Sequence, residues 1–232
     1  MRLVGARALA PLVRELTFER EDGPLVFEPG QWVNLHVPVG ERREKRAYSI
    51  ASPPGGGPRF AIAVTRVDGG VVSRALHDAD VGAALTADGP AGFFTRAADA
   101  GHPSLFVGTG TGLSPLRSML LAALARGATE PLWVLLGVRH EEDALYEEEL
   151  RALEARYPNV RLFVTLSRPR RPAERTGYVQ AHVAALYREL EQAGAPPHLY
   201  VCGLERMVKA VRDVARKELG VERQRVHSER YD

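Results

Sequence analysis

The sequence predicts two successive architectures, an antiparallel β-barrel or sandwich followed by a parallel α/β domain. Residues 1–97 read as short strands separated by turn clusters rich in glycine and proline. From Ser104 onward, short apolar runs alternate with longer segments of helical periodicity. A stretch of polar and small residues near Arg96–His102 separates the two patterns, so we expect one domain over residues 1–98 and a second over 99–232.

The strands of the first half are expected from alternating apolar residues between those turns. Two strands flank Pro11, and period-two alternation continues in Trp32–Val37 and Phe60–Val64. In the second half, strands are expected at 104–108, 131–138, 160–166, 198–202 and near 225–227, and helices at 114–126, 142–156, 180–193 and 204–218. Strands that alternate with helices in this way form a parallel sheet with helices on both faces.

Composition excludes several classes of protein. The chain has 232 residues, of which 45% are hydrophobic and 26% charged, as is typical of a globular protein with an ample core. Its net charge of +2 argues against nucleic-acid binding, and no apolar stretch is long enough to cross a membrane, so we expect a cytoplasmic protein. The one cysteine, Cys202, excludes an internal disulfide, a cysteine-rich zinc site and an iron–sulfur cluster held by this chain, and we expect no metal site.

The most informative stretch is Ser104–Met119, in which an apolar run ends in glycines at alternate positions, Gly108, Gly110 and Gly112. Ser114-Pro115 follows as a helix-start signature, because serine caps free N–H groups and proline suits the first helical position. A strand, a glycine turn and a helix N-terminus together form a cradle for a pyrophosphate. The spacing matches neither a P-loop nor Gly-x-Gly-x-x-Gly, so a nucleotide site and a tight structural turn are both open interpretations.

Three motifs precede this turn in sequence. Arg46-Ala47-Tyr48-Ser49 closes a strand, where it offers a guanidinium, an aromatic face and a hydroxyl to a ligand, or simply decorates an ordinary barrel strand. Gly70–Ser73 opens a short helix whose N–H groups could face a second phosphate. Gly89-Pro90-Ala91-Gly92-Phe93-Phe94 reads as a stiff turn that carries two aromatic residues.

Taken together, these ordered motifs resemble the ferredoxin–NADP⁺ reductase family over nearly the whole chain. The resemblance implies a flavin-binding Greek-key β-barrel followed by a five-stranded pyridine-nucleotide domain, with FAD and NADP(H) as cofactors. It implies that Arg46 contacts the FAD phosphates, that Tyr48 packs on the isoalloxazine ring and that Ser49 lies near flavin N5. The other FAD contacts that it implies are Ile62, Ala63, Val64 and Thr65 beside the ring, and Gly70, Val71, Val72 and Ser73 at the pyrophosphate.

In the second half, the same resemblance implies contacts to the nucleotide. The turn with Gly110, Thr111 and Gly112 would hold its pyrophosphate, although Thr109 and Leu113 depart mildly from the family pattern. Arg139 either lines the nucleotide cleft or is a solvated arginine at a strand end. The residues implied at the 2′-phosphate and adenine of NADP⁺ are Ser167, Arg168, Tyr178 and Gln180, with Arg175 adding positive charge. An arginine-rich loop in solvent is the alternative interpretation.

The resemblance also implies a reaction centre that involves the end of the sequence. Cys202-Gly203 would lie beside the nicotinamide, Glu229 would relay protons near the flavin, and Tyr231 would cover the flavin ring. Asp232 extends beyond the family's terminal Glu-x-Tyr, so a charged tail in solvent is the alternative. We therefore expect the catalytic residues to be Tyr48, Ser49, Cys202 and Glu229.

The expected activity is hydride transfer between NADP(H) and FAD, and single-electron transfer between the flavin and a separate carrier of the ferredoxin or flavodoxin type. An acidic carrier could meet Arg42, Arg43, Arg74 and Arg96. Fold does not fix the acceptor, so a reductase component of an oxygenase and a reductase of free flavin or ferric chelates are alternatives. A flavin- or nucleotide-binding regulatory subunit without turnover is the non-enzymatic alternative, and FMN could replace FAD.

Overall fold

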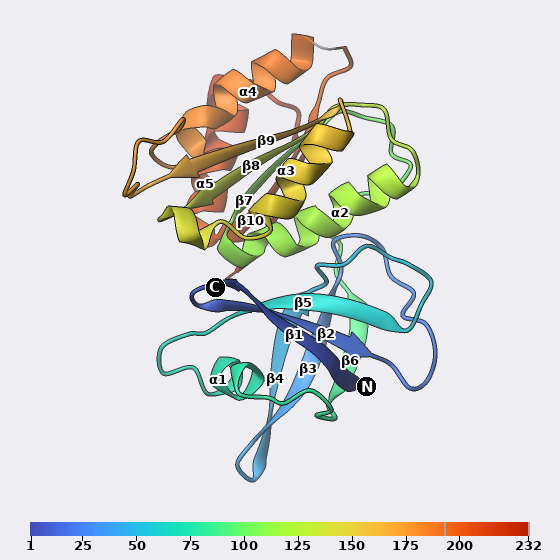
Figure 1. Ribbon diagram of the computed structural model, residues 1–232. Helices are drawn as coiled ribbons and strands as arrows, with labels where there is room; N and C mark the ends of the chain where they lie inside the picture. Colours follow the sequence, from blue (N-terminus) through green and yellow to red (C-terminus); the bar gives the residue numbers. More distant parts are fainter. Residues whose placement is uncertain (193, 232) are drawn as a thin grey trace.

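The first half of the molecule consists of two antiparallel three-stranded sheets around one apolar core. The computed structural model describes residues 1–192 and 194–231, and Figure 1 shows this half below the other. The strand orders are β1-β2-β5 and β4-β3-β6. The strands are β1 (Arg2–Ala10), β2 (Val13–Glu19), β3 (Trp32–Val39), β4 (Arg42–Ser49), β5 (Arg59–Thr65) and β6 (Thr86–Ala91). In β3, Val33, Leu35 and Val37 point into the core, as the two-residue period of a strand requires. The short helix α1 (Val71–His77) packs beside β3.

The second half is a five-stranded parallel sheet with helices on both faces (Figure 1). Its strands, in the order β11-β10-β7-β8-β9, are β7 (Ser104–Thr109), β8 (Leu132–Val138), β9 (Val160–Leu166), β10 (His198–Leu204) and β11 (Val226–Tyr231). Helices α2 (Leu113–Ala125) and α3 (Glu147–Arg156) pack on one face, and α4 (Gln180–Gln192) and α5 (Glu205–Asp213) pack on the other. Every residue of β8 is buried because both faces of the sheet are covered.

One apolar cluster crosses the junction between the two halves. Val13, Ala51 and Phe94 of the first half belong to the same cluster as Leu116 and Met119 of α2. The end of β11 also returns to this junction (Figure 1). The halves therefore share a packed interface, which fixes α2 against the strand ends of the first half.

The structure confirms the predicted sequence of an antiparallel half and a parallel α/β half, with differences of detail. The predicted helix over 142–156 is broken, because a 3-10 turn at Glu141–Asp143 precedes α3, which begins only at Glu147. The last strand extends to Tyr231 rather than lying near 225–227. The first residues of the predicted stiff turn at Gly89–Phe94 belong to β6.

Arg96 lies in the connection between the halves, where it is buried with 1% of its surface exposed. Its guanidinium donates to Ser104 Oγ at 3.0 Å, to the Ala97 and His102 carbonyl oxygens at 3.2 Å each, and to Glu130 Oε1 at 2.8 Å. A buried charge needs such partners, and these occupy the guanidinium inside the fold. The prediction that Arg96 meets an electron carrier at the surface is therefore wrong.

Candidate active site

The glycine turn after β7 lies directly against the end of β10. After Thr109 the chain makes a 3-10 turn over Gly110–Gly112 and then enters α2. Gly110 has a φ of 52°, a conformation that favours glycine. A Cβ on Gly112 would lie 2.3 Å from the Cys202 carbonyl oxygen, so the close approach of these two segments requires glycine. The turn and Cys202 are thus neighbours in space.

Two hydroxyl groups that flank this turn, Thr109 Oγ1 at the end of β7 and Ser114 Oγ in the first turn of α2, are buried without a hydrogen-bond partner among the described residues. The sequence predicts that Ser114 caps α2, but the helix begins one residue earlier and Ser114 makes no capping bond. An orphaned buried hydroxyl is costly unless a ligand or water completes it. The first turn of α2 also leaves N–H groups without an intrahelical acceptor. This set of donors fits the pyrophosphate of a dinucleotide.

Side chains from both halves of the molecule meet beside Cys202. Cys202 is paired with Glu229 in the register of β10 and β11. The Tyr231 hydroxyl donates to Ser49 Oγ at 2.6 Å, and the Ser49 hydroxyl donates to Glu229 Oε1 at 3.3 Å. This connected series of hydroxyl and carboxyl groups crosses the junction and can hold or pass a proton.

Burial sets the protonation of this cluster. It raises the pKa of the Cys202 thiol, so this group is a neutral thiol at pH 7 rather than a nucleophilic thiolate. Burial also raises the pKa of the Tyr231 hydroxyl well above its ordinary value. The pKa of Glu229 is likewise raised by burial, although the hydrogen bond from Ser49 opposes the shift. Glu229 is therefore an acid whose protonated form the fold favours.

Replacing Glu229 by glutamine is expected to change how thermal stability depends on pH. A carboxyl whose folded pKa is raised stabilises the fold fully below its unfolded pKa, and this contribution is lost as pH rises through the folded pKa. Glutamine does not titrate, so the Tm of the variant minus that of the wild type should rise from about pH 4, near the unfolded value, and level off above the folded pKa. Differential scanning fluorimetry at a series of pH values measures the Tm of both proteins. A Tm difference that does not change with pH would contradict this prediction.

Arg46 and Tyr48 occupy alternate positions on β4. The Arg46 guanidinium is loosely held, because it donates to the Lys45 carbonyl oxygen at 2.8 Å and lies 3.7 Å from Glu44. Tyr48 is half-buried, and burial raises the pKa of its hydroxyl to about 12, although the nearby Arg46 opposes this. An exposed arginine beside a neutral aromatic face fits the phosphates and ring of a flavin.

The predicted flavin segment in β5 offers little side-chain surface. Ile62 and Val64 point into the core of the first half, and Ala63 belongs to the cluster between the halves. Thr65, at the end of the strand, is exposed. A ligand beside this strand would therefore meet Thr65 and backbone groups rather than the side chains of Ile62 and Val64.

The Ser73 hydroxyl closes the loop that precedes α1. It donates to the Gly70 carbonyl oxygen at 3.2 Å and accepts a bond from the Val67 N–H at 3.0 Å. This hydroxyl therefore shapes the loop. The N–H groups of Val71 and Val72 lie in the first turn of the helix and have no intrahelical acceptor, so they are available as donors.

The arginine-rich loop after β9 is joined to the end of β8. The N–H groups of Ser167 and Arg168 donate to the carbonyl oxygens of Val138 and Arg139 at 3.0 and 2.9 Å. The side chains of Arg139 and Arg168 are exposed, and neither forms an ion pair within the part of the chain that the structure describes. Two guanidinium groups near one strand edge are thus available to an anion.

The other residues predicted to bind the nucleotide in this loop differ in how far their side chains already contact other residues. Arg175 lies 4.7 Å from the centroid of the Phe163 ring and pairs with Glu174 at 3.0 Å, so part of its charge is already compensated. Tyr178 is 65% exposed and offers an open aromatic face. Gln180 is the first residue of α4. Arg175 is therefore a weaker candidate for phosphate recognition than Arg168.

Sequence reasoning missed the residues that hold this loop in place. The Glu141 carboxylate accepts bonds from the backbone N–H groups of Arg170 and Arg171 at 3.0 Å each, and backbone hydrogen bonds hold its pKa below the usual range. His140 Nδ1 lies 2.6 Å from the Arg168 carbonyl oxygen. The acidic run that begins at Glu141, three residues after the strand predicted over 131–138, was the available signal.

Comparison with known proteins divides the chain in the same way. Residues 3–95 match the family model of the oxidoreductase FAD-binding domain, and residues 106–213 match that of the oxidoreductase NAD-binding domain. The chain is 57% identical over 235 residues to ferredoxin–NADP reductase B of Sorangium cellulosum (strain So ce56), with 100% of this chain and 96% of that protein covered. The chain belongs to the ferredoxin–NADP reductase family.

Other similar proteins extend beyond this chain or resemble it in fold alone. The toluate 1,2-dioxygenase electron transfer component of Pseudomonas putida is 33% identical over 196 residues, which are 84% of this chain and 56% of that protein. The crystal structure of Amycolatopsis cytochrome P450 reductase GcoB has a TM-score of 0.86 and 29% identity, covering 99% of this chain and 68% of that one. A ferredoxin–NADP⁺ reductase from Plasmodium falciparum with 2′P-AMP shares the fold, with a TM-score of 0.81 at 23% identity.

Membership of the ferredoxin–NADP reductase family makes this chain a flavin oxidoreductase with FAD and NAD(P)(H) as cofactors and an electron carrier as partner. The orphaned hydroxyls of the glycine turn and the loosely held Arg46 are the features of this structure that fit the two cofactors. In residues 1–192 and 194–231, no helix combines the length and apolar character needed to cross a membrane.

Proposed function

We propose that this chain transfers a hydride between NADP(H) and FAD, and single electrons between the flavin and a ferredoxin or flavodoxin. Residues 1–98 would hold the flavin and residues 99–232 the nucleotide. The observation that carries the proposal is the contact of Ser49, at the end of β4, with Glu229 and Tyr231 of β11. A strand end predicted to bind flavin thereby contacts β11, which is paired with the strand that carries Cys202.

The residues at the junction have separate roles in this proposal. FAD, when bound, supplies the hydride and single-electron chemistry. The glycine turn and the first turn of α2 bind the nucleotide pyrophosphate, and Cys202, as a small neutral thiol, leaves room for a flat ring. Glu229, in its protonated form, holds a proton that Ser49 and Tyr231 connect to the flavin-binding strand. The apolar cluster between the halves excludes water from this region.

A preference for NADP(H) over NAD(H) is supported by the charge of the loop after β9. Arg139 and Arg168 are exposed without a carboxylate partner among the described residues, and Tyr178 offers a face for an adenine ring. A site that prefers NAD(H) would be expected to present an acid to the ribose hydroxyls. Glu141 instead turns its carboxylate toward backbone N–H groups of the loop.

The proposed carrier is a separate acidic protein. Arg42, Arg43 and Arg74 are exposed and form no ion pair within the described ranges, so they can meet negative charge on a partner. The single cysteine leaves no set of thiolates for an iron–sulfur cluster in these 232 residues. A role as the reductase of an oxygenase system is the second candidate, because similar proteins include an oxygenase electron transfer component.

One experiment tests the proposed function. The purified protein, reconstituted with FAD, is mixed anaerobically with NADPH and separately with NADH while the visible flavin absorbance is followed. We expect rapid bleaching by NADPH and slower bleaching by NADH, then recovery of the absorbance when oxidised ferredoxin is added at low ionic strength. Equal bleaching by both nucleotides would remove the NADP(H) preference, and no bleaching by either would overturn the function. Failure to recover with ferredoxin or flavodoxin, but recovery with an oxygenase component, would select the second candidate.

Replacing Tyr48 by alanine is expected to weaken flavin retention. The half-buried ring of Tyr48 is the aromatic surface on β4 nearest to Arg46 in sequence, and its removal takes away the proposed stacking face. We expect the Kd for FAD to rise about tenfold, as a loss of roughly 1.5 kcal/mol would give, so that less FAD stays bound through gel filtration. Phenylalanine at the same position should retain the flavin, and unchanged occupancy in the alanine variant would contradict stacking.

A further inference from the structure

Tyr146 has an unusual backbone for a bulky residue. Its φ is 56°, which makes it the one residue other than glycine with a positive φ among those that the structure describes. Tyrosine adopts this left-handed region at a cost of about 1–3 kcal/mol, so the surroundings must hold it there. The residue directly precedes α3 and breaks the helix that the sequence predicts over 142–156. Tyr146 is nevertheless buried, with 6% of its surface exposed.

The Tyr146 ring contacts charged residues from both halves of the molecule. The guanidinium carbon of Arg117, on α2, lies 4.4 Å from the ring centroid, and that of Arg7, on β1, lies 5.7 Å from it. Arg7 pairs with the buried Glu15 of β2 at 2.6 Å. The Tyr146 hydroxyl faces Glu15 without forming a well-made hydrogen bond. It is therefore the ring, and not the hydroxyl, that joins the two halves.

Arg117 extends this contact to the flavin-binding strand. Its Nη1 donates to the Ala51 carbonyl oxygen at 2.6 Å, two residues after Ser49. Its other nitrogens form a forked pair with the Glu149 carboxylate at 2.8–3.2 Å. Beside it, the Ser118 hydroxyl donates to the Ser52 carbonyl oxygen at 2.8 Å. The Arg117 side chain is 11% exposed, so these bonds are largely shielded from water.

We propose that Arg117, held by Tyr146 and Glu149, is a positioning residue that fixes the reacting part of the nucleotide against the flavin. This inference rests on the proposed function. Helix α2 begins at the glycine turn, which lies against Cys202, and Arg117 stands one turn further along the same helix. A rigid helix bonded to Ala51 transmits the position of the flavin-binding strand to the nucleotide turn.

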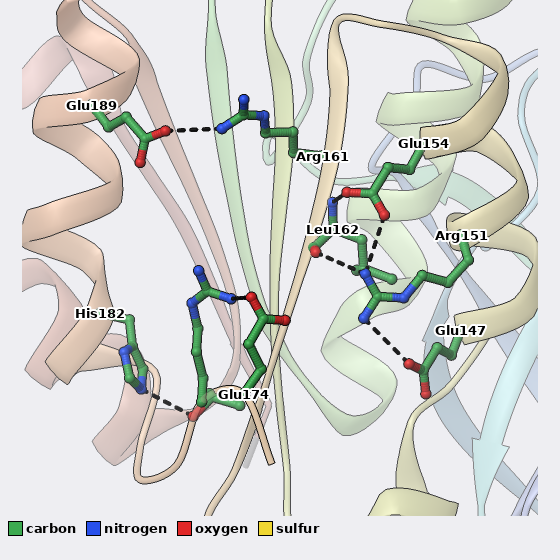
Figure 2. A network of polar contacts seen from close by, with 10 residues as sticks. Glu147, Arg151, Glu154, Arg161, Leu162, Glu174, His182 and Glu189 are labelled. Atoms are coloured by element: carbon green, nitrogen blue, oxygen red, sulfur yellow. Dashed lines mark hydrogen bonds and ion pairs between the residues drawn. The ribbon is translucent and has the colours of Figure 1, made fainter.

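The test requires a variant that removes these bonds and one that removes similar bonds elsewhere. Arg117→Met keeps the apolar part of the side chain and loses the guanidinium group. Arg117→Lys keeps the positive charge but cannot form the paired hydrogen bonds of a planar guanidinium. Arg151→Met is the matched control, because Arg151 on α3 bonds to Glu147, Glu154 and the Leu162 carbonyl oxygen, all within the second half (Figure 2). Tyr146→Phe removes the hydroxyl and keeps the ring.

Two readouts separate positioning from general stability. In the FAD-loaded enzyme, we expect Arg117→Met to slow the limiting rate of flavin bleaching by NADPH about tenfold, because a small misplacement of reacting groups is costly. The NADPH concentration at half-maximal rate and the FAD content should stay unchanged. In the FAD-free protein, calorimetry should show one unfolding transition for the wild type and two for Arg117→Met. Arg151→Met and Tyr146→Phe should behave as wild type in both measurements.

The possible outcomes decide between the inference and its alternatives. A bleaching rate within about twofold of wild type in Arg117→Met, or an equal loss in Arg151→Met, would overturn the positioning role. Two transitions in the wild type would show that the halves are not coupled and would overturn it as well. If NADPH fails to reduce the wild-type flavin, the proposed function fails and calorimetry alone decides the coupling. If Arg117→Met does not fold, both measurements are made on Arg117→Lys, for which we expect a smaller loss in the limiting rate of flavin bleaching.

Discussion

Replacing Gly112 by alanine is expected to abolish rapid flavin reduction by NADPH while the protein keeps its FAD. The new Cβ would lie 2.3 Å from the Cys202 carbonyl oxygen, 2.6 Å from the Cys202 carbonyl carbon and 2.8 Å from the Gly203 nitrogen. All three atoms are backbone, so no rotation of a side chain can relieve the clash. The turn or the end of β10 must move, and we expect a loss of about 10²-fold in the limiting rate for a shift of about 1 Å.

The control for this prediction is Gly55→Ala, at a turn of the first half where an added Cβ meets nothing within 4 Å. Its reduction rate and Tm should match those of the wild type. Stopped-flow absorbance with NADPH measures the rate, and gel filtration with a flavin spectrum measures the FAD content. A normal rate in Gly112→Ala would show that the contact between the turn and Cys202 has no part in the reaction. Loss of FAD would place the damage in the flavin-binding half instead.

Replacing Arg168 by alanine is expected to raise the KM for NADPH by about 10²-fold and to leave the KM for NADH nearly unchanged. Two charge-assisted hydrogen bonds to a phosphate contribute roughly 1.5 kcal/mol each at the low end, which corresponds to about 10²-fold. The low end applies because the Arg168 side chain is exposed, and solvent screens its charge. The bond from His140 to the Arg168 carbonyl oxygen involves the backbone, so the loop should keep its path in the variant.

The matched control is Arg170→Ala in the same loop. The Arg170 guanidinium is already paired with Glu142 at 2.5 Å, so its loss should change the two KM values little. Steady-state kinetics with both nucleotides, at one fixed ionic strength, measures the ratio of the KM for NADPH to the KM for NADH. Equal increases for NADPH and NADH in Arg168→Ala would remove Arg168 from 2′-phosphate recognition. An effect of Arg170→Ala as large as that of Arg168→Ala would assign recognition to the charge of the whole loop.

Much of the fold could be predicted because the spacing of apolar residues along a strand or helix depends on which of its faces are buried. The fully apolar run of β8 and the alternation in β3 reflect a sheet covered on both faces and a sheet covered on one. The break at Tyr146 could not be predicted, because the residues around it are good helix formers. Contacts with Arg7 and Arg117, which are far away in sequence, override that local preference.

The candidate site was predictable in its motifs and not in its hydrogen bonds. Glycines mark where backbone segments approach closely, so the turn at Gly112 could be found from spacing alone. The hydrogen-bond partner of a serine hydroxyl, in contrast, cannot be predicted from the sequence. Ser114 lies unpartnered inside α2 rather than capping it, and Ser73 bonds within its own loop. Arg96 is another case, since a single arginine reads the same in a sequence whether buried or exposed.

The buried, protonated state of Cys202 has a consequence for chemical durability. A protein that carries reduced flavin works near peroxide and other oxidants, and thiols are attacked by them as thiolates. Because burial raises the pKa of the one cysteine of this chain and shields it from solvent, we expect its sulfur to resist both oxidation and alkylation while the halves stay packed. The packing between the two halves of the molecule therefore also shields the sulfur at their junction.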